Sequence, residues 1–462
     1  RAEQIMVAGT ATDVVFELND ASNRTRYFTL PEWQQSIDEE VPEVPEDVLL
    51  RVLGPDLAAE VVATRAEVNA AAKPEREAEM AAEREVEREA KIEKASRFHV
   101  HFGAGRLGMG LVVPAISASG IAFTIVQRSK PKWRYLFEKG LAAREKAQKP
   151  MPGLTEKEEE VEAWATGLDI TSNEEVVVHN VQLITPEMAP EHMPPKSIIL
   201  GDNPEMLHGV ASRATSFSCS LGSGMIEALL PQLEKLPERP PDDQPLLFAC
   251  ENDHNAVYDL KQRLKDKVFV VDCMVDRVCT GREITENGIG VQAEPWGGSI
   301  VILEPGVTAR IPFSSKVATV PATEREAQYL SNRKLSLVNG MHTVLAFMTL
   351  VKEYDEGGKE REYVLMKYDR MTREEQRMCE AWRAARIAEL VQEYTSENLV
   401  AWHGVSTREE AWDVLLDYAD YTLSERFAKV DDLVSRVLGG GVSNRWLTRL
   451  RPVEVWMSGR EG

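Results

Sequence analysis

A short apolar segment followed at once by a glycine-rich turn restricts what this chain can fold into. Residues 98–102 (Phe-His-Val-His-Phe) precede Gly103-Ala-Gly105-Arg-Leu-Gly108, and residues 107–116 are again apolar. A strand, a G-x-G-x-x-G turn and a helix in this order are typical of a dinucleotide-binding unit, because the glycines let backbone N–H groups approach a pyrophosphate. The alternative is a tight turn with no ligand. Pro114 predicts a kink in the helix, since proline removes a helical hydrogen bond.

The pattern that follows predicts an α/β fold. Short apolar strands alternate with helical stretches up to about residue 310, which favours a doubly wound parallel sheet of the Rossmann type. From Glu324 onward the pattern is mostly helical, with helices expected at 381–394, 408–421 and 430–438. We therefore expect an N-terminal extension (1–96), a dinucleotide-binding domain (97–310) and an all-helical C-terminal domain (311–462). The strands are expected at 98–102, 122–126, 176–178, 181–184, 197–200, 246–249 and 268–271.

The extension has two parts with different composition. Residues 14–18 and 27–30 are rich in strand-forming side chains and lie on either side of a polar turn, which predicts a small hairpin. Residues 75–94 are an Ala/Glu/Arg tract with few apolar side chains. A solvated helix that links the extension to the core is one interpretation of this tract, and an arm that docks a protein partner is the other.

Composition and charge exclude several classes of function. The 462 residues are 43% hydrophobic, enough to bury substantial cores, and no apolar run or signal-peptide pattern predicts membrane insertion. The formal net charge of −21 argues against nucleic acid or an anionic membrane surface as a partner. Five cysteines without paired spacing predict reduced thiols. We expect a soluble intracellular protein of the cytoplasm or of an organelle such as the plastid.

A second group of polar residues lies on one expected helix. On a helix of about 100° per residue, with Lys334 at zero, His342 falls near about 80° and Asn339 near about 140°. An ammonium, an imidazole and a carboxamide would then share one side of a mostly apolar helix. Each of them alone could be structural, but burying all three without using them is costly. The trio is therefore a candidate active site, in the cleft expected between the two domains.

These two features, with four further motifs in order, resemble one enzyme family. The chain is similar to the polyol-specific long-chain dehydrogenase/reductase family, most closely its mannitol-1-phosphate 5-dehydrogenase branch, over roughly residues 97–455. Lys334 to His342 fits the family pattern K-x4-N-x2-H, and His101 to Gly108 fits H-F-G-A-G-x-x-G. The other matching motifs are Cys250-Glu-Asn252, Met274-Val-Asp-Arg277, Glu294-Pro-Trp296 and Tyr418-Ala-Asp-Tyr-Thr-Leu-Ser-Glu-Arg-Phe427.

The resemblance implies hydride transfer between a nicotinamide cofactor and a polyol or polyol phosphate, without a metal ion. The histidines and cysteines show no zinc-ligand spacing. Lys334 would be the general acid/base, provided that the pKa of its ammonium is lowered. Asn339 and Asn252 would donate to the substrate oxygen, and His342 would orient the substrate or the lysine. The alternative for Asn252 is a turn-forming role before Asp253. The implied cofactor-binding residues are Gly103, Gly105, Arg106, Leu107 and Gly108, and the implied substrate-binding residues are Asp276 and Arg426.

The end of the second strand bears on the choice of cofactor. The family branch has an Asp here, suited to the ribose hydroxyls of NAD, whereas this chain has Gln127. Arg128, Ser129 and Lys130 follow, and they could bind a 2′-phosphate. We therefore expect NADP to be favoured over NAD. The alternative is that both cations are merely solvated.

Two departures from the family pattern leave the substrate open. Arg426-Phe427 is followed by Ala428-Lys429 in place of S-N-P, and the basic segment near the C-terminus becomes residues 439–445 (Gly-Gly-Gly-Val-Ser-Asn-Arg). A substrate of the mannitol 1-phosphate/fructose 6-phosphate type is expected, and the sequence leaves open whether the polyol carries a phosphate. A catalytically altered family member that serves as a structural or regulatory subunit, attached through residues 1–96, is the alternative.

Overall fold

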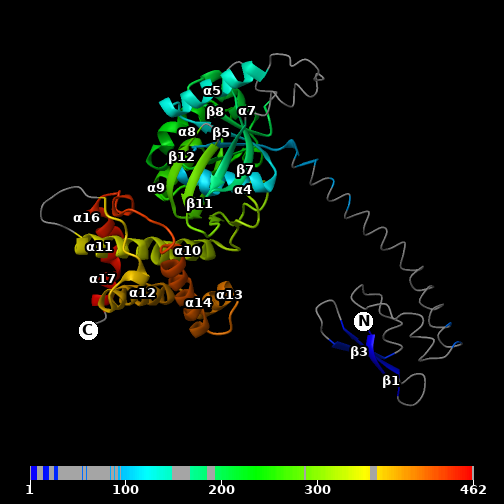
Figure 1. Cartoon of the computed structure of the whole chain (residues 1–462), viewed down its shortest axis with the longest axis vertical. Helices are drawn as coiled ribbons and strands as arrows, with labels where there is room; N and C mark the ends of the chain where they lie inside the picture. Colours follow the sequence, from blue (N-terminus) through cyan, green and yellow to red (C-terminus); the bar gives the residue numbers. More distant parts are fainter. Residues whose placement is uncertain are drawn as a thin grey trace. The chain divides into compact units, whose positions relative to one another are not determined.

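The structure is a computed structural model that describes residues 2–7, 14–19, 25–29, 97–147, 167–184, 193–285, 288–353 and 362–459, with isolated positions between 55 and 96. The chain forms two compact units, Arg1–Glu93 and Lys94–Gly462 (Figure 1). The charged tract at 75–94 lies almost wholly outside the described residues. Its role as a docking arm therefore stays a prediction.

Three antiparallel strands account for the described residues before position 55 in the first unit. They are β1 (Ala2–Val7), β2 (Val14–Asn19) and β3 (Thr25–Thr29), in the order β1-β2-β3. The expected hairpin is confirmed, since β2 pairs with β3 in a regular antiparallel register. The sequence does not predict β1, because polar Glu3 and Gln4 interrupt its apolar residues, and its pairing with β2 has an irregular register there.

Six parallel strands form the centre of the second unit. In chain order they are β4 (Phe98–Phe102), β5 (Ala122–Gln127), β8 (Lys196–Leu200), β9 (Ser216–Cys219), β10 (Leu246–Cys250) and β11 (Phe269–Asp276). Their order across the sheet is β8-β5-β4-β9-β10-β11. This is the doubly wound dinucleotide-binding order: β5 and β8 are added on one side of β4, and β9, β10 and β11 are added on the other. The predicted α/β fold class is confirmed.

Further strands widen this sheet beyond the purely parallel one expected. Antiparallel hairpins β6–β7 and β12–β13 extend the β8 side, and β14 and β15 extend the β11 side. The separate strands predicted at 176–178 and 181–184 are wrong. They form one strand, β7, which is irregular where Asn180 has a φ of 56°. β15 also lies past residue 310, where we expected the sheet to end. The bounds are Gly167–Ser172 (β6), Glu175–Leu183 (β7), Cys279–Ile284 (β12), Gly288–Ala293 (β13), Ser299–Ile302 (β14) and Ala318–Thr319 (β15).

Helices cover both faces of the sheet, each over its own apolar core (Figure 1). One core includes Phe123 and Phe248, and the other includes Val100 and Phe217. The first face carries the π-helical turn η2 (Gly108–Val112), α4 (Val113–Ser119) and α5 (Pro131–Ala147). The second carries α7 (Pro204–Arg213), α8 (Met225–Leu233) and α9 (His254–Leu264).

Pro114 is accommodated by a change of helix type and by a distant arginine. The helix is π-helical over η2 and becomes a regular α-helix at Val113, so Pro114 lies in the first turn of α4. Proline has no N–H to donate to the carbonyl four residues earlier, which is that of Gly110. Arg277 donates to this carbonyl instead. The Arg277 side chain therefore supplies the hydrogen bond that Pro114 removes.

The rest of the second unit is helical, as predicted. A continuous helical run from Glu324 to Glu353 is π-helical at its centre, and α14 has the predicted bounds. The helix predicted at 430–438 is wrong except for α15. The Asp432 carboxylate accepts from the N–H of Leu433, and Leu433 pairs with Val364 in an isolated β-bridge, so the chain is not helical there. The elements are α10 (Glu324–Arg333), η6 (Lys334–Gly340), α11 (Met341–Glu353), α12 (Arg373–Glu393), α13 (Ser396–His403), α14 (Arg408–Tyr421), η8 (Thr422–Arg426), α15 (Val434–Val437), α16 (Val442–Arg445), η9 (Trp446–Leu450) and α17 (Arg451–Ser458).

The run from Glu324 to Glu353 corrects one expectation. By length and composition alone it could cross a membrane, although the sequence pattern showed no run of that kind. Its apolar window is 61% buried inside the protein. Most of its apolar side chains are buried because the run packs against α12 and α15, although Leu335 and Val351 are exposed.

Candidate active site

The glycine turn after β4 has the geometry that its sequence predicts. Gly103 has a φ of 109°, and a Cβ there would lie 2.8 Å from the Ser220 carbonyl oxygen. A Cβ on Gly108 would lie 2.5 Å from the Gly103 oxygen. The nearest atom to a Cβ on Gly105 is 3.6 Å away, so the protein itself does not require glycine there. The turn thus holds two sterically required glycines and one that keeps the backbone accessible to a ligand.

The side chains in and beside this turn hold it in place by hydrogen bonds and by packing. Arg106 is exposed and donates to the carbonyl of Thr280, and Leu107 packs on the core beneath η2. Gln127, at the end of β5, is buried, and its Oε1 accepts from the N–H of Ala104 at 3.0 Å. Its Nε2 donates to the carbonyl of Arg128. Gln127 therefore supports the turn from the position where an acid would meet a ribose.

The cations after Gln127 face solvent. Arg128 and Lys130 are exposed, and neither forms an ion pair within the part of the chain that the structure describes. The Ser129 hydroxyl accepts from Nε of Arg134, and Nη2 of Arg134 lies 3.6 Å from Oδ2 of Asp202. The two cations remain available to a ligand at the end of β5.

Lys334 is buried where the helical run meets the carboxyl edge of the sheet. Its side chain is the first of η6, and the residue is only 7% exposed. Nζ donates to Oδ1 of Asn252, which follows β10, at 2.7 Å. Burial lowers the pKa of Lys334 to about 8, with Arg449 and Arg426 acting in the same direction and Asp276 opposing them. A substantial fraction of this amine is therefore neutral near pH 8.

Asn252 does not form the turn that was the alternative for it. Asp253 is the N-cap of α9 and accepts from the N–H of Ala256 at 3.1 Å. On the other side, Glu251 accepts from the N–H groups of Leu221 and Gly222. The neighbours of Asn252 thus hold the loop, which leaves its carboxamide free to meet Lys334.

The other two members of the trio do not hydrogen bond to Lys334. The ring of His342 stacks on Phe427 at 4.2 Å, and its Nε2 lies 3.0 Å from Oδ2 of Asp432. Burial lowers the pKa of His342, and Asp432 only partly offsets this, so the imidazole is neutral. Asn339 is half-buried, and its carboxamide has no hydrogen bond to any described residue. The run is π-helical over η6, so the angles between these side chains differ from those of the α-helix that the sequence predicts.

The predicted substrate-binding pair, Asp276 and Arg426, forms a buried ion-pair cluster. Arg426 is 1% exposed and donates to Asp276 at 2.7 Å and to Glu294 at 2.5 Å. Trp296 lies over the guanidinium at 4.3 Å, and Tyr418 donates to Asp276. These contacts engage Nε, Nη1 and Nη2 of Arg426. The cluster joins η8 to the sheet beside Lys334, and a direct contact with substrate stays a prediction.

Sequence reasoning missed several residues around the trio. Asp432 faces His342 and is paired with Arg436, and Arg449 donates to the Thr343 hydroxyl at 3.2 Å. None of them lies in a motif, and all are distant from the trio in sequence, so the single sequence carries no signal for them. Among the described residues, no group of three or more potential metal ligands occurs.

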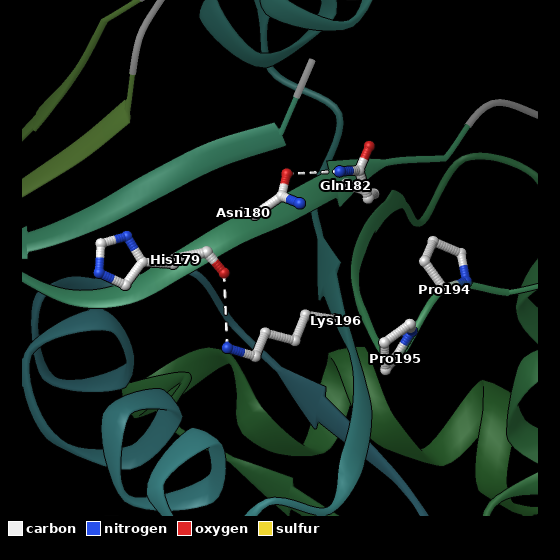
Figure 2. Close-up of a pocket in the computed structure, with 6 residues that line it drawn as sticks. All are labelled: His179, Asn180, Gln182, Pro194, Pro195 and Lys196. Atoms are coloured by element: carbon white, nitrogen blue, oxygen red, sulfur yellow. Dashed lines mark hydrogen bonds between the residues drawn. The ribbon is translucent and has the colours of Figure 1, made fainter. Parts of the chain in front are cut away.

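A cavity of about 550 Å³ lies elsewhere on the sheet, between β7 and β8 (Figure 2). It is lined by His179, Asn180, Gln182, Pro194, Pro195 and Lys196, and Lys196 donates to the His179 carbonyl. None of the predicted site residues lines it. This cavity is therefore separate from the candidate active site.

Comparisons with known proteins give structural matches only. No protein-family model matches the sequence, and neither does any curated protein. A D-mandelate dehydrogenase with NADH and anilino(oxo)acetate is 12% identical, with 76% of this chain and 92% of that chain covered and a TM-score of 0.36. An NADP⁺-bound yersinopine dehydrogenase is 12% identical (79% and 93% covered, TM-score 0.37), and an octopine dehydrogenase with NADH and agmatine is 13% identical (72% and 76%, TM-score 0.36). The identities and TM-scores are low, so the likeness is distant.

Proposed function

We propose that this protein is an NAD(P)-dependent dehydrogenase that transfers a hydride between the cofactor and a polyol or polyol phosphate. The hydrogen bond between Lys334 and Asn252 carries the proposal. It places a buried amine with a lowered pKa at the carboxyl edge of the sheet, the edge that also carries the glycine turn. The family resemblance of the motifs supports the same reaction and adds the substrate class.

The residues at this edge fit a nicotinamide dinucleotide. The accessible backbone at Gly105 would take the pyrophosphate, next to the start of the helix that leads into η2. Arg128 and Lys130, both exposed at the end of β5, favour NADP, because a 2′-phosphate accepts charge-assisted hydrogen bonds. The bound cofactor would accept or donate the hydride.

Lys334 would move the proton of the substrate hydroxyl. Its neutral amine takes this proton when the alcohol is oxidised, and its ammonium returns the proton when the ketone is reduced. Asn252 holds the amine through Oδ1, which leaves its Nδ2 to donate to the substrate oxygen. We assign Asn339 as a second donor and His342 as a neutral group that orients the substrate. The reaction so described requires no metal ion.

An excess of positive charge next to the trio favours a phosphorylated substrate. Burial, together with the neighbouring cations Arg445 and Arg386, lowers the pKa of Arg449 to about 10. Arg449 and Arg445 form no ion pair with a carboxylate among the residues that the structure describes. A phosphate would compensate this charge, and charge-assisted hydrogen bonds to guanidinium groups are strong.

The experiment is oxidation of NADPH and of NADH by the purified protein, with fructose 6-phosphate and with fructose as acceptors. We expect turnover that is faster with the phosphate ester and lost by orders of magnitude in Lys334→Met, while cofactor still binds. Lys352→Met is the matched control, because Lys352 lies in the same helical run and pairs with Glu375 near the surface. Cofactor binding without turnover on either acceptor would favour the alternative of a structural or regulatory subunit attached through residues 1–96.

A further inference from the structure

Two histidines lie in the centre of the sheet, and the proposed hydride transfer does not use them. His99 and His101 belong to β4, the strand that leads into the glycine turn, and neither has any solvent exposure. Ser216 and Ser218 face them from β9 and are also buried. Burying four polar side chains costs free energy unless each is hydrogen bonded.

The four side chains form one chain of hydrogen bonds that ends at the glycine turn. Ser216 Oγ lies 2.8 Å from His99 Nδ1, and His99 Nε2 lies 2.7 Å from Ser218 Oγ. Ser218 Oγ is also 2.7 Å from His101 Nδ1. His101 Nε2 lies 3.0 Å from the carbonyl oxygen of Gly103, the first residue of the turn.

The carbonyl at the end fixes the direction of every hydrogen bond in the chain. The Gly103 oxygen can only accept, so His101 Nε2 carries a hydrogen and Nδ1 must accept from the Ser218 hydroxyl. Ser218 has no second hydrogen, so it accepts from Nε2–H of His99, and His99 Nδ1 then accepts from Ser216. Burial lowers the pKa of His101 to about 4 and that of His99 as well, so both rings are neutral as this arrangement requires.

The ring of His101 is also packed against the far end of the turn. A Cβ on Gly108 would lie 2.9 Å from His101 Nε2. Ser220, which follows β9, lies 3.2 Å from the same Nε2 and 3.4 Å from the Gly103 oxygen. The His101 side chain therefore contacts both ends of the segment from Gly103 to Gly108.

We propose that His101 is a positioning residue for the dinucleotide: its Nε2–H holds the Gly103 carbonyl away from the ligand, so that the N–H groups that follow Ala104 in the turn face the pyrophosphate. The inference rests on the proposed function for its ligand. His99 is buried to the same extent but is two hydrogen bonds further from the turn. It supplies the matched control.

The test compares the variants His101→Phe and His99→Phe by fluorescence titration with NADH and NADPH. Loss of one hydrogen bond of about 1 to 1.5 kcal/mol predicts a Kd about tenfold higher in His101→Phe. We expect less than about a threefold change in His99→Phe, although both variants lose thermal stability. His101→Gln should recover part of the affinity, because its amide N–H can replace Nε2–H. Equal affinities of the two Phe variants would overturn the inference. Failure of the wild-type protein to bind either cofactor would instead overturn the proposed function.

A second measurement needs no substitution of either histidine. The ¹⁵N chemical shifts of labelled histidine distinguish the two tautomers of the neutral ring. We expect both His99 and His101 to carry their hydrogen on Nε2 in the free protein. A hydrogen on Nδ1 of His101, or a charged ring at neutral pH, would overturn the inference whatever the cofactor affinities are.

Discussion

The pKa of Lys334 gives a prediction whose size follows from the structure. Its ordinary value is 10.5, and in the protein it is about 8, mainly because the ammonium is buried. A difference of this size corresponds to about 3 kcal/mol against the charged form. Because the pKa of Lys334 is lowered, the amine becomes neutral as the pH rises through about 8, and alcohol oxidation should speed up over this range. Ketone reduction, which needs the ammonium, should slow over the same range.

Asn252→Asp tests the cause of this pKa. The substitution places a carboxylate at the position of Oδ1, which is 2.7 Å from Nζ. At an effective dielectric constant of 20, the attraction at this distance is about 6 kcal/mol, before solvent screening at the exposed position 252. The remainder is enough to cancel much of the burial effect, so the titration of Lys334 should move to higher pH.

The assay follows the Cε resonance of ¹³C-labelled lysine against pH, with Lys334→Met to assign the signal. It requires neither cofactor nor substrate, so it is independent of which polyol is used. We expect a midpoint near 8 in the wild-type protein and an alkaline shift in Asn252→Asp. A wild-type midpoint at the ordinary value for lysine would refute the assignment of Lys334 as the acid/base.

Three further predictions concern the cofactor, the extension and the helix at Pro114. Arg128→Asp should weaken NADPH binding relative to NADH, measured by fluorescence titration, and tighter binding of NADH than NADPH by the wild-type protein would contradict the expected preference. A protein that starts at Ser96 should stay folded and keep its cofactor affinity, since Lys94–Gly462 is a compact unit. Loss of the folded state by circular dichroism would show that the extension is integral. Arg277→Met should lower the free energy of unfolding in urea by about 1 to 3 kcal/mol, because the Gly110 carbonyl opposite Pro114 loses its donor. An unchanged unfolding midpoint would show that this carbonyl finds another partner.

The parts of the fold that depend on local pattern could be predicted from the sequence. The glycine turn requires glycine at Gly103 and Gly108 for steric reasons, and such requirements are visible in a single sequence. The apolar strands are also predictable from the sequence, because a strand that is buried on both faces of the sheet is a short apolar run. The sequence does not predict β9, because Ser216 and Ser218 make it polar and their hydrogen-bond partners lie on β4. A side chain satisfied by a distant strand leaves no local signal.

The candidate site shows the same division. The motifs that the family resemblance placed in order predicted that Lys334 and Asn252 belong to one site, and the hydrogen bond between them comes from the structure. The partner of His342 could not be predicted, because Asp432 lies in a segment expected to be helical and is brought in by tertiary packing. The π-helical form of η6 could not be predicted either, because a 3.6-residue period assumes an α-helix.

The most direct test of the account is transfer of deuterium from the reduced cofactor to the product. The protein is incubated with NADPH deuterated at C4 of the nicotinamide and with fructose 6-phosphate, and the product is analysed by mass spectrometry. We predict a polyol phosphate that carries one deuterium on the carbon that was the ketone, and no labelled product from Lys334→Met. If the wild-type protein binds the cofactor but yields no deuterated product from fructose 6-phosphate or fructose, the proposed polyol dehydrogenase activity is contradicted.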